Sequence, residues 1–585
     1  MGDEIELSTA PATQEPLLLL LHPRRETFEH GLLLPLSNLV FSGGTQNLAP
    51  LKAKLLCAAS SPPRIDALAV SKTLEIALDH ALLILETLAA VLPSDSDQPA
   101  AANRNDEISA DVDDLILFFY LQSYRRLLPR PQSHKDSASV ADVMPMPSTS
   151  AFDECLSLLS STQLVHSNGR RVAPSEAEEE AYQLSYLKKH LANIIALLAE
   201  PAGGEDEQSL VLTSEKFERL GFLIQFCENG SEVVPLSQAA TFFANSDPVM
   251  PPVPFPAAQV LYWLLQNIGT SLVHIAKKVS TKESAPSRAF DLDVATDDAN
   301  TSHLEGQNSS PPSRTPSNSN AAYSRSQTFV EGFSKACIVK QACDCDIKGC
   351  SVKILNCHDS MIYILAPLRY ATVYGCSDAT IVLGAIGKSV RVDHCERVQL
   401  IAAAKRISIS NCRECVFFLG VNQRPVLLGD NHMLQVAPHN TFYSQLTEHV
   451  NQVGIDCTVN RWDEPLAMGM VDPHGSLSCF ARASDVEAPS ATCLDPSRFT
   501  NFLIPNWLGG ESTQSEKHNP FPLPEIYKSA QMKNNLVSKE IKQALRDAPL
   551  DENQKREIVS ALHVHFKDWL YASGNIRQLY CLRRD

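Results

Sequence analysis

The sequence predicts a multidomain α + β protein with a helical amino-terminal region, a coil of short parallel strands and a helical carboxyl-terminal tail. Three observations predict this class: helical apolar spacing before residue 280, a cysteine-centred repeat at 327–438, and two amphipathic stretches after residue 525. We therefore expect a helical region at 1–280, a disordered linker at 281–326, a parallel β-helix at 327–438, and a mixed segment with a helical tail at 439–585.

Five stretches of the amino-terminal region have the apolar spacing of helices. In the last of them Val260, Leu264 and Ile268 share one face, and Pro256 stands where prolines commonly start helices. The apolar patch at 115–120, with Tyr124, is interpreted as helix core, and a partner-binding face is the alternative. The expected helices span 66–92, 111–128, 175–200, 213–228 and 256–279.

The linker has too few apolar residues to form a core. Residues 309–320 consist of Ser, Pro, Asn, one Arg and one Thr, a composition that cannot offset the entropy of ordering the chain. We expect a flexible connection here.

Net charge and cysteine usage favour a cytoplasmic protein that binds other proteins. The chain carries a net charge of −17 with a pI near 5.5, whereas nucleic-acid binding needs clustered Lys and Arg. The acidic start and the short leucine run at 17–21 predict neither a secretory leader nor a membrane span. The 16 cysteines are therefore expected to be reduced thiols.

Four cysteines mark the repeat. Cys357, Cys376, Cys395 and Cys412 follow one another after 19, 19 and 17 residues. Apolar residues stand three and five positions before each cysteine, and again five and seven positions after it, which is the alternation of strands. At the cysteine the spacing between apolar residues changes from two to three, so the chain must turn there. Several short strands per repeat of about 20 residues predict a parallel β-helix, and the leucine and asparagine frame of leucine-rich repeats is missing.

The cysteines and acidic residues of the repeat offer little for chemistry. Cys343 and Cys345, and likewise Cys412 and Cys415, could suggest zinc, but we favour structural packing because four ligands at compatible spacing are missing. We predict no metal and no cofactor. A carboxylate cluster of the polysaccharide-degrading β-helices is not expected either, since Asp359 and Asp378 are followed on the next repeats by Arg397 and Glu414. These four residues predict a mixed ladder of charges.

Apolar segments at 502–507 and 520–524 are expected to cover an edge of the β-helix, because an open end exposes unpaired strand groups. The tail helices are expected at 525–547 and 551–572, and they could cap the β-helix or pack on the amino-terminal region.

The run from 341 to 431 resembles the C-CAP/cofactor C-like domain, which is found in tubulin-binding cofactor C, the retinitis pigmentosa 2 protein and cyclase-associated proteins. The resemblance rests on the Asn-Cys elements, on the strands at 351–355 and 406–410, and on the closing run at 417–427. It implies a right-handed parallel β-helix. Active members of that family are GTPase-activating proteins that use an arginine finger against tubulin or Arl-type small GTPases.

Aligned on the Cys412 element, the family's catalytic arginine falls at Ser408, so the finger is absent. Arg391, at the same place one repeat earlier, and Arg406 could substitute only in a shifted docking register, and such catalysis depends on position at about the ångström scale. Arg391, Lys405, Arg406 and Arg413 form either a solvated basic edge or a protein-binding face.

These observations favour a non-enzymatic, cytoskeleton-associated protein. The resemblance implies a role at microtubule-organising centres, including the centrosome and spindle pole, in Golgi positioning and in cell shape and morphogenesis. Partners would be proteins, such as tubulin or a small GTPase. The alternatives are an active GTPase-activating protein and a tubulin-folding cofactor without catalysis.

Overall fold

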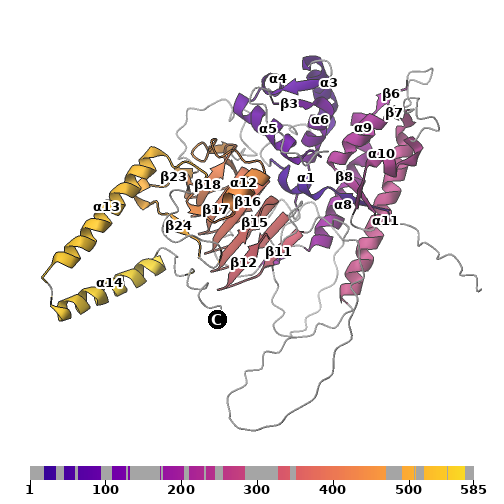
Figure 1. The fold of residues 1–585 in the computed structure, drawn as a ribbon. Coiled ribbons are helices and arrows are strands. Elements are labelled where there is room, and N and C mark those ends of the chain that lie inside the picture. The colour runs from indigo at the N-terminus through magenta and orange to yellow at the C-terminus, as the bar shows by residue number, and fades with distance from the viewer. Residues whose placement is uncertain are drawn as a thin grey trace, which may run out of the picture. The chain divides into compact units, whose positions relative to one another are not determined.

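The computed structural model describes most of the chain (Figure 1). The described residues are 19–33, 45–59, 63–93, 108–126, 130–131, 171–172, 175–202, 210–228, 232–243, 254–283, 327–342, 351–468, 491–505, 508, 519–549, 551–572 and 577. Contacts group the chain into two compact units, and the predicted linker lies almost entirely outside the described residues. Unit 1 comprises residues 1–24 and 180–324, and unit 2 comprises 25–179 and 325–585. The two units therefore alternate along the chain.

Unit 1 combines two long helices with small antiparallel sheets. The leucine run forms strand β1 (Leu19–Pro23), which pairs with β8 (Ile224–Glu228), and β8 pairs with β9 (Glu232–Val234). The expected helix at 213–228 is therefore wrong in its second half. It ends with α9 (Ser214–Glu218) and a 3-10 turn, because the buried strand pairing overrides helical propensity.

The two long helices of unit 1 agree with the sequence prediction. They are α8 (Glu176–Leu198), of which residues 180–198 belong to this unit, and α11 (Ala257–Glu283). Trp263 of α11 packs against Phe226 of β8, with ring centroids 5.2 Å apart. A second small sheet contains β6 (Glu200–Pro201), β7 (Leu210–Leu212) and β10 (Phe255–Pro256), and the remaining helix is α10 (Leu236–Ala239).

The helical part of unit 2 is built around a fully buried helix. Every residue of α6 (Val112–Leu121) is buried, which confirms that the apolar patch at 115–120 is helix core. The expected single helix at 66–92 is two helices, because Glu75 takes a left-handed conformation (φ 56°) between them. The elements are α1 (Arg25–His30), α3 (Leu48–Ala58), β2 (Arg64–Asp66), α4 (Ala67–Leu74), α5 (Leu78–Val91) and β3 (Ser109–Asp111).

The repeat region forms one 12-stranded parallel sheet. Strands about one repeat apart lie side by side in the predicted register: Val352 pairs with Ala371, Ala371 with Val390, and Val390 with Ile407. The strands are β11 (Gln327–Glu331), β12 (Cys337–Gln341), β13 (Ser351–Leu355), β14 (Met361–Leu365), β15 (Leu368–Tyr374), β16 (Thr380–Asp393), β17 (Gln399–Ser410), β18 (Val416–Val421), β19 (Val426–Leu428), β20 (Leu434–Pro438), β22 (Leu466–Met468) and β23 (Ala491–Cys493).

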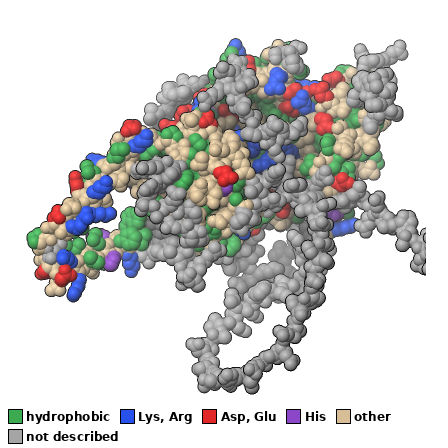
Figure 2. All heavy atoms as spheres, viewed as in Figure 1, with side chains coloured by type: hydrophobic (Ala, Val, Ile, Leu, Met, Phe, Trp, Pro, Cys, Tyr) green, Lys and Arg blue, Asp and Glu red, His purple; other side chains and the backbone are tan. Residues whose placement is uncertain are grey.

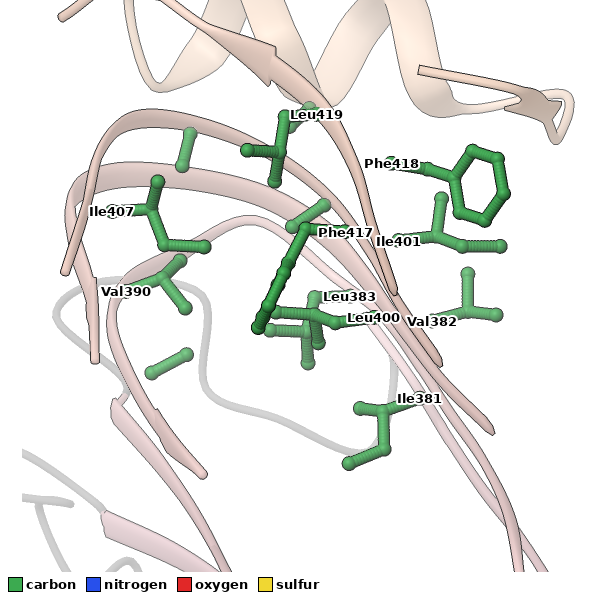
Figure 3. Packing of buried hydrophobic residues seen from close by; sticks show 14 of the residues in the cluster. Ile381, Val382, Leu383, Val390, Leu400, Ile401, Ile407, Phe417, Phe418 and Leu419 are labelled. Atoms are coloured by element: carbon green, nitrogen blue, oxygen red, sulfur yellow. The ribbon is translucent and has the colours of Figure 1, made fainter. Parts of the chain in front are cut away.

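Apolar side chains fill both sides of these strands. On the inner side Leu400 and Phe417 lie across from Val390, while Ile401 and Phe418 project from the other side of the same strands (Figure 3). That other side is covered by the segment after β23, where Phe499 lies 6.1 Å from Phe418 between ring centroids. Gly420 lies so close to Phe521 that a Cβ there would come within 2.6 Å of the Phe521 ring. Of the two apolar segments predicted as covers, 520–524 therefore packs on the sheet through Phe521, and 502–507 contributes Phe502, whose ring lies 6.4 Å from that of Tyr363 between centroids.

Two helices end the described chain at the predicted positions, α13 (Glu525–Asp547) and α14 (Glu552–Ala572). Tyr527 anchors the start of α13 because its hydroxyl donates to the Leu494 carbonyl at 2.6 Å and its ring packs against Phe499 and Trp462. The rest of both helices is largely exposed. Before them stand α12 (Leu446–Gln452), β21 (Thr441–Phe442) and β24 (Phe502–Leu503). No helix in the described ranges is long and apolar enough to cross a membrane.

Candidate functional site

An outward-facing row of side chains crosses four neighbouring strands of the parallel sheet. Lys353 of β13 pairs with Thr372 of β15, Thr372 with Arg391 of β16, and Arg391 with Ser408 of β17. We call these four residues the outer row. Each stands four positions before a repeat cysteine, so its side chain points away from the inner core. The predicted catalytic slot, Ser408, therefore belongs to a face that a partner could approach only if nothing else covered it.

Helix α1 of the same chain covers much of the outer row. The Glu29 carboxylate accepts hydrogen bonds from Thr372 Oγ1 at 2.6 Å and from Lys353 Nζ at 3.2 Å. The His30 ring stacks on Tyr370, with centroids 4.5 Å apart. The side chains of Glu29 and Lys353 are only 15% and 10% exposed. The outer row is thus occupied by an acidic segment from a distant part of the sequence.

The charges in this contact stabilise one another. Burial alone would raise the pKa of Glu29, but Lys353, the Thr372 hydroxyl and Arg126 outweigh it and hold that pKa well below the usual range. Burial likewise opposes the charge of Lys353, yet Glu29 and Glu179 raise its pKa. His30 is neutral, because burial lowers its pKa to about 3 despite the nearby Glu29 carboxylate. The contact is therefore between a carboxylate and an ammonium group, with a neutral imidazole beside them.

Arg391 is held inside the protein and is not a free arginine. Its Nη2 donates to Asp393 Oδ2 at 2.6 Å, its Nη1 donates to the Glu29 carbonyl at 3.3 Å, and the residue is 3% exposed. Although burial raises the pKa of Asp393, Arg391 and His394 outweigh that effect and keep it far below its ordinary value. Arg391 would have to break a buried ion pair before it could reach a bound nucleotide.

Helix α5 covers the neighbouring part of the same face. Tyr370 Oη donates to the Ala90 carbonyl at 3.0 Å, and Arg424 Nη1 donates to Asp79 Oδ2 at 2.8 Å. Arg406 lies beneath this helix, 3% exposed, and burial lowers its pKa to about 10 against the opposing charge of Glu86. Arg406 Nη1 has no hydrogen-bond partner among the described residues.

The four predicted basic residues therefore do not share one open surface. Arg391 and Arg406 are buried, Lys405 is half-buried with a pKa lowered by burial, and Arg413 is exposed. Ser408 is half-buried. A protein-binding face made of this set stays a prediction only for Lys405 and Arg413, because α1 and α5 already contact the other two.

The repeat cysteines lie inside the sheet. Cys357, Cys376, Cys395 and Cys412 are at most 2% exposed, and each thiol lies 3.2–3.6 Å from the carbonyl oxygen two residues earlier. Among the described residues, no group of three or more His, Cys, Asp or Glu side chains is placed to hold a metal ion. Cys343 and Cys345 lie outside the described residues.

The turns at the cysteines carry the mixed charge ladder that the sequence predicts. Asp359, Asp378, Arg397 and Glu414 all take left-handed backbone conformations, with φ between 46° and 53°. Arg397 contacts both carboxylate oxygens of Asp378 at 2.8 Å. Arg577, beyond α14, adds contacts to Asp359 at 3.3 Å and to Asp378 at 3.6 Å. The ladder pairs opposite charges and does not gather carboxylates for catalysis.

Sequence reasoning missed the residues that cover the site. Lys353 and Thr372 stand in the same repeat register as Ser408, so the register itself could have identified them. Glu29 and His30 gave no such signal, because a single short helix has no repeat and its contacts are with strands more than 300 residues away.

Part of the chain is similar to known proteins. Residues 349–467 match the family model described as Tubulin binding cofactor C, so the chain contains a TBCC domain. Three similar proteins are each called TBCC domain-containing protein 1. The Gallus gallus protein is 30% identical over 231 residues (40% of this chain and 39% of the relative), and the Homo sapiens protein is 29% identical over 233 residues (40% and 39%). The Danio rerio protein is 27% identical over 229 residues (39% and 37%). The match thus spans about two fifths of these relatives.

Proposed function

We propose that this chain is a non-enzymatic, cytoskeleton-associated protein whose TBCC domain binds other proteins without stimulating GTP hydrolysis. The match to the Tubulin binding cofactor C family supports a tubulin-related role. We extend the proposal to the cytoplasm and to microtubule-organising centres such as the centrosome and spindle pole, with consequences for Golgi positioning and cell shape. Tubulin or a small GTPase is the proposed partner, and the stacked strands are proposed to coil as a right-handed parallel β-helix.

One observation carries the non-enzymatic proposal. Ser408 occupies the place of the family's arginine, and its row is covered by Glu29 and His30 of the same chain. A serine cannot supply the positive charge that stabilises a phosphoryl-transfer transition state. The nearest replacement, Arg391, is bound to Asp393. Both the residue in the slot and the burial of the nearest arginine argue against catalysis.

The decisive experiment measures GTP hydrolysis by tubulin and by Arl-type small GTPases with and without the full-length chain. We expect no increase, whereas an arginine finger accelerates hydrolysis about 10³- to 10⁵-fold. Acceleration by the wild-type chain would contradict the proposal. Loss of that acceleration in Arg391→Lys, with retention in the exposed control Arg413→Lys, would then assign it to Arg391, since both variants keep the charge and differ in burial.

A binding measurement tests whether the chain binds tubulin or small GTPases at all. Sedimentation of the chain with tubulin heterodimers should show association without a change in hydrolysis. Absence of association with both tubulin and the small GTPases would remove the tubulin-related part of the proposal and leave the catalytic result unaffected.

A further inference from the structure

Helices α13 and α14 expose apolar side chains along their whole lengths. Eleven large apolar residues of these helices are 39–67% exposed, and hydrophobic and charged side chains alternate on their surfaces in Figure 2. They are Ile526, Met532, Leu536, Val537, Ile541, Leu545, Val559, Leu562, Val564, Phe566 and Trp569. Such a surface on two helices is large enough to signal an interaction, because isolated apolar residues need no explanation but long stripes do.

The exposed stripe of α13 has an acidic edge and a basic edge. At 3.6 residues per turn, Val537, Ile541 and Leu545 share one face of the helix. Lys533, Glu540 and Asp547 follow one another at seven-residue spacing along one side of this face, which leaves that edge with a net negative charge. On the other side stand two basic residues, Lys542 and Arg546.

Helix α14 has the same arrangement, with its basic and acidic edges on the same sides as those of α13. Its stripe contains Leu562, Phe566 and Trp569, and the Phe566 and Trp569 rings stack with centroids 5.8 Å apart. Viewed from the amino-terminal end, Glu552, Arg556 and Lys567 stand on the side where α13 has its basic edge and carry a net positive charge, and Glu557 and Asp568 stand on the other side.

These edges determine how the two stripes can meet. Two helices packed antiparallel bring equivalent edges together, which would place Lys542 beside Arg556 and Lys567, and Glu540 beside Glu557 and Asp568. Two helices packed parallel bring opposite edges together, so that each acidic edge meets a basic one. Like charges at neighbouring positions are destabilising and opposite charges stabilising. The stripes are therefore matched for parallel packing.

Parallel packing is impossible between α13 and α14 of one chain. Only residues 548–551 connect them, and a connection this short joins helices that run in opposite directions. A second copy of the chain removes this restriction, because a two-fold axis perpendicular to the helices sets α13 of one copy parallel to α14 of the other, twice. Stable dimers bury roughly 800 Å² on each partner, and the half-exposed apolar side chains of the two stripes together with their charged edges offer an area of that order.

We propose that α13 and α14 form a homodimer interface, in which α13 of each copy packs parallel to α14 of its partner copy. The Tyr527 anchor and the Arg577 contacts hold the two ends of this helical pair on the sheet of its own chain. The dimer is then a property of the full chain and is independent of the covered outer row.

The test uses the full-length chain in sedimentation velocity from nanomolar to tens of micromolar concentration, the range expected for interfaces of this size. The wild-type chain should be a dimer at the upper end. Replacing Leu562 and Phe566 by Asp should give a monomer with unchanged circular dichroism, because both side chains are exposed. A wild-type chain that stays monomeric throughout would overturn the proposal.

Charge reversal distinguishes the proposed pairing from other contacts. Variant A carries Glu540→Lys and Asp547→Lys, and variant B carries Arg556→Glu and Lys567→Glu. Each alone should weaken the dimer at least about tenfold, which corresponds to about 1.4 kcal/mol. A 1:1 mixture of A and B should restore it, because each acidic edge again meets a basic one. Failure of the mixture to dimerise, or dimers that neither variant weakens, would rule out this pairing. Glu414→Lys, on the exposed charge ladder, is the control and should change nothing.

Discussion

The Glu29 carboxylate accepts a hydrogen bond from Thr372 Oγ1 at 2.6 Å, although 343 residues separate the two in the chain. Lys353 approaches the same carboxylate. This small polar contact fixes an amino-terminal helix on the face of the sheet that contains the outer row. Its removal should therefore affect both stability and access to that face.

Glu29→Ala should release α1 from the sheet. The change leaves the largely buried Lys353 with one acidic partner fewer, and breaking a buried pair costs about 3 kcal/mol. Amide hydrogen exchange in residues 25–30 should become on the order of a hundredfold faster, since each tenfold corresponds to about 1.4 kcal/mol. The matched change Glu396→Ala removes a carboxylate that is 47% exposed beside Arg397 and should cost less than about 1 kcal/mol. Equal exchange rates in the two variants would refute the role of Glu29.

Acid should destabilise the protein through His439, in addition to His30, before its carboxylates titrate. His439 is 2% exposed, and burial lowers its pKa to about 4 although Asn519 opposes the shift. The unfolded state binds a proton below the ordinary pKa of 6.5, whereas the folded state does so only near 4. The unfolded state thus takes up more protons in this window, and stability falls as pH falls from 6.5 to 4.

The loss amounts to about 3 kcal/mol by the lower end of that window, at roughly 1.4 kcal/mol for each pKa unit. Urea denaturation at several pH values should show a flatter profile for His439→Gln than for the wild-type chain. His432→Gln removes an exposed imidazole and serves as the control. A His439→Gln profile parallel to that of wild type would show that His439 is protonated in the folded state.

Gly420→Ala should destabilise the sheet by about 1–3 kcal/mol, the usual cost of overpacking. The new Cβ would lie 2.6 Å from the Phe521 ring, which covers this part of the strand. Gly269 in α11 provides the opposite case, because a Cβ there meets nothing within 4 Å. Gly269→Ala should raise stability by up to about 1 kcal/mol through helix propensity. Thermal unfolding of the two variants should shift in opposite directions, and a shared direction would contradict the packing.

Native alkylation should distinguish two groups among the described cysteines. Cys57 and Cys493 are exposed and should react with iodoacetamide, whereas Cys357, Cys376, Cys395, Cys412 and Cys415 are buried and should react only after unfolding. Peptide mass spectrometry measures the labelled fraction at each site. Labelling of the repeat cysteines in the folded protein would show that these turns open to solvent.

The repeat could be predicted because its physics is local and recurs. A two-residue alternation fixes which side chains face inward, so Val352, Ala371, Val390 and Ile407 pair as the register requires. The tail helices follow from their apolar spacing in the same way. The segment at 224–228 could not be predicted as a strand from its own residues, since its conformation depends on pairing with β1, some 200 residues earlier.

Only part of the candidate site could be predicted from the sequence, because the rest depends on contacts with distant segments. The register located Ser408 and showed that its side chain points outward. Burial of Arg391 and Arg406 depends on α1 and α5, which carry no repeat and no sequence signal that they lie on this sheet. The outward position of a basic residue predicts a surface residue, whereas contacts with helices from a distant part of the chain bury Arg391 and Arg406.

The alternation of the two units along the chain has a consequence for synthesis. At about 5–20 residues per second, Glu29 leaves the ribosome some tens of seconds before Lys353, Thr372 and Arg391 are made. During that interval α1 has no sheet to bind. Unit 2 can complete its folding only after all of unit 1 has been translated. Folding of the TBCC domain therefore includes a late step, in which the newly translated strands bind helix α1, which was translated much earlier.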